Sequence, residues 1–217
     1  FVLRRPLVIH EQNAVAGTTN RWLAPLAKQV LLGLPGAFEL GATRRLIGNP
    51  VRSEIRVLYD LDDEIPEAFT QDRPIRLLVV GGSLGSGPLN SGVPAALTGL
   101  AENDSRRLDI RHQCGDQHLE PTQEHYGAAV GASIEVLAFI DDMAAAYQWA
   151  DLVVCRSGAL TVSELMVTGT ASILVPLPHA IDDHQTHNAR ILSEAGAGCL
   201  LPQDSSLGPQ LSELLQG

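Results

Sequence analysis

The sequence predicts an α/β fold built on a parallel sheet. Short apolar segments alternate with helical patterns along the chain, which is typical of βαβ units. Two of the apolar segments run directly into small polar turns that precede helices, GGSLGSG at Gly81–Gly87 and RSG at Arg156–Gly158. The 217 residues are 45% hydrophobic and 18% charged, so the chain can bury the core of one domain and part of another.

Apolar and helical periodicity place the individual elements in order. We expect strands at Leu7–His10, Val30–Leu32, Arg45–Ile47, Ile75–Val80, Leu108–Gln113, Ile134–Leu137, Leu152–Val154, Ser172–Val175 and Gly198–Leu201. We expect helices at Thr18–Lys28, Leu89–Ala101, Asp142–Trp149, Leu160–Thr168, Gln185–Ala195 and Ser206–Leu215. Pro94 falls inside the second of these helices and predicts a kink or a restart there.

Two stretches bear on domain organisation. The stretch from Arg52 to Arg73 is rich in Asp and Glu, contains Pro66 and lacks a clean period, which predicts a surface linker between two lobes. The chain opens with Phe1 and reaches an apolar strand almost at once. Because a parallel strand needs neighbours to satisfy its backbone, we expect an N-terminal portion to precede this one.

Charge and cysteine usage exclude several classes of function. The net charge of −10 argues against a nucleic-acid partner, which would need a basic stripe. Cys114, Cys155 and Cys199 lie too far apart for paired metal ligands and indicate free thiols in a reducing compartment. Three histidines gather at His179, His184 and His187, but their spacing matches no compact zinc signature. We therefore expect neither a metal nor a cofactor.

The two turns predict an anion site. A strand, a small-residue turn and a helix leave the first N–H groups of the helix unpaired, and a phosphate fits there. Gly81, Gly82 and Gly85 allow the backbone to approach an anion closely, and Ser83 offers a hydroxyl. Two such cradles in one sheet predict a nucleoside diphosphate. A tight turn without a ligand remains an alternative, because the glycines do not follow the dinucleotide pattern and the strand Leu108–Gln113 does not end on an acid.

Five segments, in a fixed order, resemble the MurG family of glycosyltransferases. They are HEQNAVAGTTNRWLA (residues 10–24), GNPVR (48–52), VVGGSLGS (79–86), FIDDMAAAYQWADLVVCRSGALTVSE (139–164) and PLPHAIDDHQTHNA (176–189). The resemblance implies a GT-B fold, in which two Rossmann-like lobes face each other across a cleft. It assigns residues 1–47 to a partly present N-terminal acceptor lobe, 48–73 to the interlobe linker, and 74–217 to the C-terminal UDP-GlcNAc-binding lobe, which we expect to be truncated at its end.

The resemblance also implies an activity. The family transfers GlcNAc from UDP-GlcNAc to the C4 hydroxyl of MurNAc in lipid I, with inversion, and so makes lipid II for peptidoglycan synthesis. It implies peripheral attachment to the cytoplasmic face of the bacterial membrane through the missing part of the N-terminal lobe. Two alternatives remain open: another UDP-sugar enzyme such as a UDP-GlcNAc 2-epimerase, and a UDP-sugar-binding fragment without activity. For this chain alone we expect binding without transfer, because its acceptor segment cannot form its own sheet.

The resemblance assigns most donor contacts to the segments after the predicted strands. The main chain at Ile140 would read the uracil, and the N–H groups at Leu160 and Thr161 would face the diphosphate. The Glu164 carboxylate would accept both ribose hydroxyls, although a solvated helix acid is the alternative. Arg52 would neutralise diphosphate charge, although it could equally be a linker arginine in solvent.

The remaining assignments concern the sugar and the acceptor. His184 and Gln185 would touch sugar hydroxyls, and Asn13 resembles a sugar or acceptor-side contact. Arg156 is either a ligand contact or part of a structural salt bridge. His10 is a poor candidate for the catalytic base, since a lone histidine at a strand end is more often structural. The general base is not identifiable in these residues, and we expect it in the missing N-terminal segment.

Overall fold

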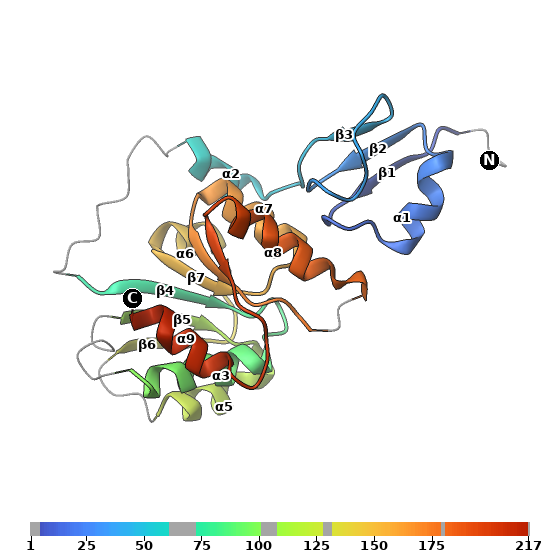
Figure 1. The fold of residues 1–217 in the computed structure, drawn as a ribbon. Coiled ribbons are helices and arrows are strands. Elements are labelled where there is room, and N and C mark those ends of the chain that lie inside the picture. Colours follow the sequence, from blue (N-terminus) through green and yellow to red (C-terminus); the bar gives the residue numbers. More distant parts are fainter. Residues whose placement is uncertain (1–4, 61–72, 101–107, 128–131, 179–180, 217) are drawn as a thin grey trace.

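The structure, a computed structural model, describes residues 5–60, 73–100, 108–127, 132–178 and 181–216. Within these ranges the chain forms two parallel sheets with helices packed on them (Figure 1), which confirms the predicted α/β class. The strands are β1 (Val8–Glu11), β2 (Gln29–Leu32), β3 (Arg44–Leu46), β4 (Ile75–Val80), β5 (Leu108–Gln113), β6 (Ser133–Leu137), β7 (Leu152–Cys155), β8 (Ala171–Leu174) and β9 (Gly198–Leu200). Each of them lies where the sequence predicts a strand.

The helices agree with the predictions less closely. They are α1 (Thr18–Leu23), α2 (Ser53–Asp60), α3 (Gly87–Thr98), α5 (Leu119–Tyr126), α6 (Met143–Trp149), α7 (Ala159–Thr168), α8 (His184–Glu194) and α9 (Leu207–Gln216), with short 3-10 turns at Ala24–Leu26, Asp116–His118 and Ile181–Asp183. The predicted helix from Thr18 stops at Leu23, because Pro25 has no N–H to continue it. The sequence did not predict α5, which buries only Thr122 and Tyr126 and so has a thin apolar stripe.

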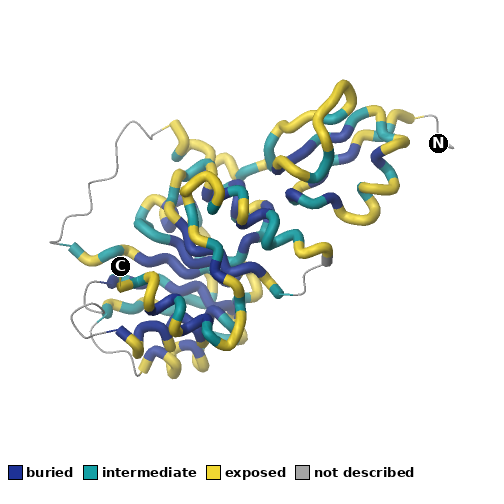
Figure 2. The backbone as a smooth tube through the Cα atoms, viewed as in Figure 1, coloured by how far each residue is buried: buried dark blue, intermediate teal, exposed yellow. Residues whose placement is uncertain are grey.

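The larger sheet has the strand order β6-β5-β4-β7-β8-β9, and every neighbouring pair is parallel. Helices α3, α5 and α9 cover one face, and α2, α6, α7 and α8 cover the other (Figure 1). Side chains alternate along β4. Leu77 and Val79 therefore pack in the core beneath α3 and α9, whereas Leu78 packs in the core on the opposite face, beneath α6 and α7. The central strands are buried on both faces (Figure 2), as expected of a doubly wound sheet.

Helix α3 passes through Pro94 without the predicted restart. A proline at this position cannot donate to the carbonyl of Asn90, four residues earlier. The Nδ1 atom of His125 on α5 lies 3.3 Å from that carbonyl oxygen and donates to it instead. The neighbouring helix therefore replaces the missing bond, and the helix continues.

The smaller sheet corrects an expectation. Residues 8–46 do form a sheet of their own, with the parallel order β1-β2-β3. Val30 and Leu32 on its central strand are buried and pack against Ile9 and Ala24. The expectation was wrong because β3 pairs with β2, so the segment has three strands and not the isolated pair that is only marginally stable.

The predicted linker also needs correction. Residues 53–60 are not surface linker but helix α2, which packs on α6 and α7. Ile55 is fully buried, and Leu58 and Val51 pack against the same core. The sequence predicted a linker because the apolar face of α2 is narrow and the stretch as a whole is rich in Asp and Glu. Residues 61–72 of the predicted linker lie outside the described ranges.

Candidate functional site

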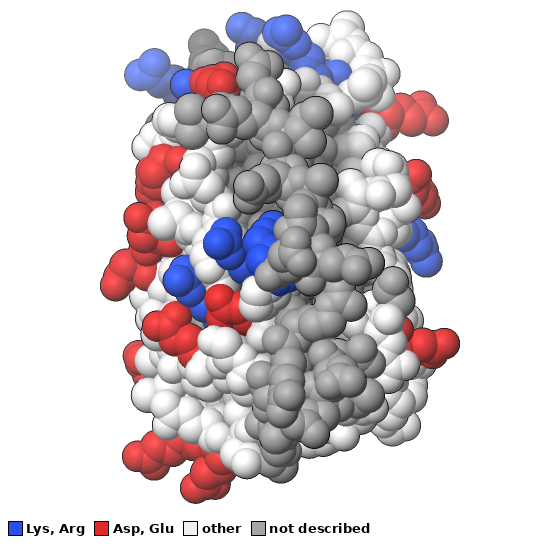
Figure 3. Space-filling view, turned by 90° about the vertical axis from the view of Figure 1, so that its left-hand side faces the viewer, with Lys and Arg blue, Asp and Glu red and all other residues white. Residues whose placement is uncertain are grey.

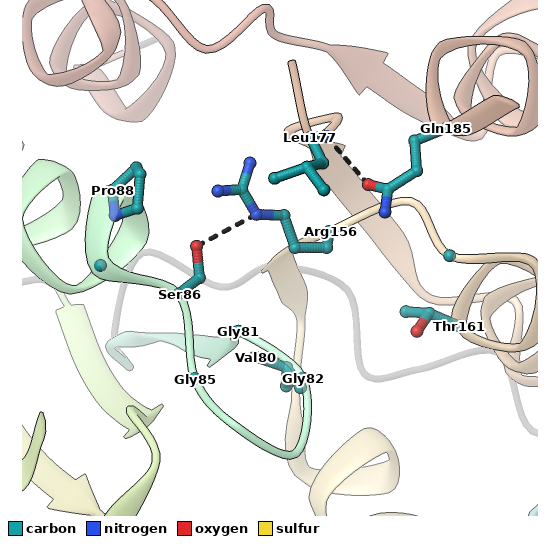
Figure 4. Close-up of a pocket in the computed structure, with 12 residues that line it drawn as sticks. Val80, Gly81, Gly82, Gly85, Ser86, Pro88, Arg156, Thr161, Leu177 and Gln185 are labelled. Carbon is teal, nitrogen blue, oxygen red and sulfur yellow. Dashed lines mark hydrogen bonds between the residues drawn. The ribbon is translucent and has the colours of Figure 1, made fainter. Parts of the chain in front are cut away.

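A pocket of about 480 Å³ lies at the carboxyl ends of β4 and β7. β4 stands between β5 and β7, so the strand order reverses at this point. Ligands of open α/β sheets bind at such a reversal, because the loops leaving the two strands diverge and leave a crevice. The pocket is lined by Val80, Gly81, Gly82, Gly85, Ser86, Gly87, Pro88, Arg156, Gly158, Thr161, Leu177 and Gln185 (Figure 4).

The glycine loop after β4 forms one wall of the pocket. Gly82 and Gly85 have positive φ angles of 87° and 77°, which glycine adopts without strain. A Cβ atom at Gly85 would overlap the carbonyl oxygen of Cys114, so the two backbones touch directly. Ser86, and not the predicted Ser83, turns into the pocket, whereas Ser83 is exposed and lies outside its walls. The loop thus presents backbone and one buried hydroxyl.

The start of α7 forms the opposite wall. The first bond of the helical ladder runs from the Val162 N–H to the Gly158 carbonyl, at 2.9 Å. The N–H groups of Ala159, Leu160 and Thr161 therefore have no acceptor within the helix. Thr161 lines the pocket, whereas the side chain of Leu160 is 45% exposed and lies outside it. The two predicted phosphate cradles face one cavity.

Arg156 brings a positive charge to the pocket between these walls. Its Nε atom donates to Ser86 Oγ at 3.0 Å (Figure 4), and its Nη atoms donate to the carbonyls of Val175 and Pro176 and to Gln203 Oε1. All of these partners are uncharged, so the predicted alternative of a structural salt bridge is wrong for the described residues. Burial lowers the pKa of the guanidinium, which nonetheless stays charged near neutral pH. The pocket therefore favours an anion.

Behind the glycine loop, a buried chain of hydrogen bonds fixes the end of β5. Asn90 Nδ2 donates to the Cys114 carbonyl at 3.0 Å, which leaves Asn90 Oδ1 to accept from His112 Nε2 at 3.1 Å. His112 Nδ1 must then accept from the Tyr126 hydroxyl, 2.8 Å away. Burial lowers the pKa of His112 to about 4, so the imidazole is neutral and keeps this direction of donation. The backbone that Gly85 touches is therefore rigidly held.

Glu164 and Arg52 are brought together by the structure. Arg52 donates from Nε and Nη2 to Glu164 Oε1, at 3.1 and 3.0 Å. The buried Tyr147 hydroxyl donates to Glu164 Oε2 at 3.1 Å. Burial raises the pKa of Tyr147, so its hydroxyl keeps the proton that it donates. Both carboxylate oxygens are engaged, and the predicted ribose and diphosphate contacts are paired with each other.

The predicted sugar contacts lie at the start of α8. Gln185 lines the pocket, and its Oε1 atom accepts from the Leu177 N–H at 2.9 Å, which leaves its amide N–H₂ as a donor group (Figure 4). His184 is the first residue of α8 and is not among the pocket's walls. Ile140 is half-buried and packs against the core that contains Tyr147. Contacts of these residues with a nucleotide sugar stay predictions.

The HEQN segment at the end of β1 is organised by Glu11, which the sequence did not single out. This buried carboxylate accepts from the N–H groups of Asn13 and Gly17 and from Asn20 Nδ2, at 3.0, 3.0 and 2.8 Å. Burial would raise the pKa of Glu11, but the bonds from Asn20, Asn13 and Gly17 outweigh it and hold the pKa below its ordinary value. His10 Nε2 donates to the Gly48 carbonyl at 3.3 Å, which fits the structural role expected of it.

Asn188 on α8 joins the two sheets. Its Nδ2 atom donates to Asn13 Oδ1 and to the Ser157 carbonyl, both at 3.1 Å, and its Oδ1 atom accepts from the Ala14 N–H at 2.9 Å. Asn188 is fully buried. The HEQN segment therefore contacts the turn after β7 through one side chain, and the side chain of Asn13 is turned toward the larger sheet.

Other chemistry is limited in the part of the chain that the structure describes. No group of three His, Cys, Asp or Glu side chains among the described residues could hold a metal ion, and His179 lies outside those ranges. Burial raises the pKa of Cys155 to about 12, so this thiol at the end of β7 is not a nucleophile near neutral pH. No described helix is long and apolar enough to cross a membrane.

Comparisons with known proteins agree with this geometry. Residues 76–217 match the model of the glycosyltransferase family 28 C-terminal domain. The chain is 52% identical, over 99% of its length, to the UDP-N-acetylglucosamine–N-acetylmuramyl-(pentapeptide) pyrophosphoryl-undecaprenol N-acetylglucosamine transferase of Chromohalobacter salexigens. The protein of that name from Azotobacter vinelandii is 53% identical over 97% of the chain. The chain spans 57% and 56% of the lengths of these relatives.

Solved structures give the same result for the fold. The crystal structure of Acinetobacter baumannii MurG superposes with a TM-score of 0.79 and 40% identity, covering 99% of this chain and 60% of that one. A putative UDP-N-acetylglucosamine 2-epimerase from Listeria monocytogenes superposes with a TM-score of 0.62 at 16% identity, covering 100% of this chain and 61% of that one. The second likeness shows a shared fold alone. The chain has the GT-B arrangement that the sequence predicted, with the smaller sheet as the partial lobe.

Proposed function

The chain belongs to glycosyltransferase family 28, and on that premise we propose that it binds UDP-GlcNAc for the transfer of GlcNAc to lipid I, which gives lipid II for peptidoglycan synthesis. The names of its close relatives support this substrate pair. The observation that carries the proposal is the pocket at the strand reversal, where the glycine loop, the start of α7 and Arg156 converge. These groups complement a diphosphate.

The proposed transfer is an inverting displacement, and the pocket geometry supports stabilisation of its leaving group. The C4 hydroxyl of the acceptor attacks the anomeric carbon, the bond to the β-phosphate breaks, and UDP leaves with the electron pair. The free N–H groups at the start of α7 and the charge of Arg156 would stabilise the negative charge that grows on the diphosphate. The hydroxyl proton needs a base, which we do not assign to a described residue.

Binding requires a rearrangement at Glu164. If its carboxylate accepts from both ribose hydroxyls, the nucleotide must displace Arg52, whose two N–H groups already occupy Oε1, whereas Oε2 can accept beside Tyr147. Arg52 would then be available to the diphosphate. On the carboxylate, the two ribose hydroxyls then replace the two N–H groups of Arg52, so the number of hydrogen bonds to Glu164 is unchanged.

Location and partners complete the proposal. An acceptor with a polyprenyl chain is a membrane lipid, so we propose peripheral attachment to the cytoplasmic face of the bacterial membrane through residues beyond those described. We propose no nucleic-acid partner. On the face shown in Figure 3, the described Lys and Arg side chains form separate groups, near the centre and along the upper and right-hand edges, with acids between them, unlike the continuous stripe that a phosphate backbone selects.

Calorimetry tests the donor site. We expect UDP and UDP-GlcNAc to bind to the 217-residue chain and ADP to bind at least about tenfold more weakly, because the base edge differs while the diphosphate is the same. Equal binding of ADP and UDP would contradict a uridine site.

Transfer is measured separately, with lipid I as acceptor. We expect no lipid II from this chain alone, since positioning two substrates supplies much of a transferase's rate and the smaller sheet, which we assign to the acceptor lobe, has three described strands. Formation of lipid II would overturn that expectation. Conversion of UDP-GlcNAc to UDP-N-acetylmannosamine would instead favour the epimerase alternative, which rests on a fold likeness alone.

A further inference from the structure

Gln113, the last residue of β5, lies between two segments that face the proposed ligand. Strand β5 is flanked by β4, which leads into the glycine loop, and by β6, which leads toward Ile140. The Gln113 side chain is buried, and its Nε2 atom lies 3.0 Å from the Gly82 carbonyl oxygen and 3.4 Å from the Ala138 carbonyl oxygen. Carbonyl oxygens only accept, so the amide nitrogen must face both of them.

Each of these two carbonyls belongs to a segment with a proposed ligand contact. The Gly82 oxygen also accepts from the Gly85 N–H at 2.8 Å, which closes the turn of the glycine loop. The Ala138 oxygen also accepts from the Gly115 N–H at 3.0 Å, and Ala138 stands two residues before Ile140. One side-chain amide therefore joins the loop that faces the diphosphate to the segment assigned to the base.

We propose that Gln113 is a positioning residue of the donor site, which fixes the separation between the diphosphate loop and the base-reading segment. The inference rests on the proposed function, because it takes the ligand to be a uridine diphosphate. Such a ligand holds its base and its phosphates at two ends of one ribose. Both ends can bind at once only when the two protein segments stand at the matching separation, and that simultaneous engagement strengthens binding.

The chemistry of the side chain supports this role. In dinucleotide-binding sheets the strand in this position ends on an acid that holds the ribose. Here Glu164 on α7 is assigned to the ribose, and the strand ends on an amide. A carboxylate at Gln113 would place negative oxygens against two carbonyl oxygens, whereas the amide donates to both.

The test compares uridine, which engages only the base-reading segment, with UDP, which engages both segments. Gln113→Met keeps the length of the side chain and removes its donors, and Gln123→Met on the exposed face of α5 is the matched control. Affinities for UDP come from calorimetry and those for uridine from ligand-observed NMR titration. We expect the dissociation constant of UDP to rise about tenfold in Gln113→Met and that of uridine to change less than about threefold, with no change in Gln123→Met.

The decisive quantity is the dissociation constant of UDP divided by that of uridine. Lower thermal stability with an unchanged ratio would overturn the proposal, because a merely structural residue weakens both ligands alike. If Gln113→Met does not fold, Gln113→Asn keeps an amide that is too short to reach both carbonyls, and the same rise in the ratio is expected. Absence of UDP binding in the parent chain would overturn the proposed function itself. Because the parent chain is measured first, this outcome is distinguished from a failure of the Gln113 proposal.

Discussion

The two ends of the donor pocket are built differently. The diphosphate end consists mainly of backbone groups, namely glycines with positive φ and the free N–H groups at the start of α7. Its one charged side chain is Arg156, whose partners are all neutral. The ribose end consists of side chains that are already bonded to one another, Arg52 and Tyr147 to Glu164. The first end is ready for an anion, whereas the second must exchange its partners.

This difference determines which substitutions matter at each end. Backbone groups cannot be removed by mutation, but the close packing at Gly85 leaves no room for a Cβ atom. Side-chain contacts can be removed singly, and each removal frees a partner as well as losing a contact. We therefore expect steric damage at the diphosphate end and graded, ligand-dependent effects at the ribose end.

The largest effect is expected from Gly85→Ala. Its Cβ would overlap the Cys114 carbonyl at a φ of 77°, so the loop must move or lose stability by about 3 kcal/mol or more. UDP affinity should fall over about a hundredfold. Gly87→Ala in the same loop meets nothing within 4 Å and should leave the thermal midpoint unchanged. Similar midpoints for the two variants would show that the loop is not confined by its packing.

Glu164→Ala is expected to come second. Loss of two hydroxyl bonds to a carboxylate should weaken UDP by roughly 1.5–3 kcal/mol in calorimetry. The alanine variant also leaves the Tyr147 hydroxyl without its acceptor, so Glu164→Gln, which keeps an acceptor oxygen, is measured beside it. Glu124→Ala on the exposed face of α5 is the control. Unchanged UDP affinity in Glu164→Ala would remove the carboxylate from the site.

Gln185→Ala should separate the sugar from the nucleotide. The free amide N–H₂ of Gln185 faces the pocket, so its loss should weaken UDP-GlcNAc by about 1 kcal/mol while UDP changes little. Calorimetry with both ligands measures the difference. Equal losses would mean that Gln185 acts by holding Leu177 and not by touching the sugar.

The smallest effect is expected from Arg52→Gln, which should change the affinities for uridine and for UDP in different directions. Removing the arginine frees Glu164, so uridine should bind up to about fivefold more tightly, the range of a partly exposed ion pair. UDP should gain less or bind more weakly, because Arg52 no longer reaches the diphosphate. NMR titration measures the change in affinity for uridine, and calorimetry measures the change for UDP. Weaker binding of uridine would contradict the proposed competition for Glu164.

The sequence predicted the backbone end of this site better than the side-chain end. Glycine spacing and strand–turn–helix order are local signals, so the loop and the start of α7 were found. Tyr147 was missed because its helix reads as plain core, and Gln113 because its partners, Gly82 and Ala138, are distant in sequence. Helix α2 was missed for a similar reason, since it packs on α6 and α7, which are both distant in sequence.

Asn188 has a mechanical consequence. It is bonded at once to Asn13, to the backbone of Ala14 and to the Ser157 carbonyl, so the two sheets share one fully buried side chain. Two further contacts cross the same boundary: Asn49 Nδ2 donates to the Gln12 carbonyl and to Ser163 Oγ, and Arg21 pairs with Asp182. A shift of the smaller sheet must therefore break bonds at several points at once, one of them directly behind the turn that carries Arg156.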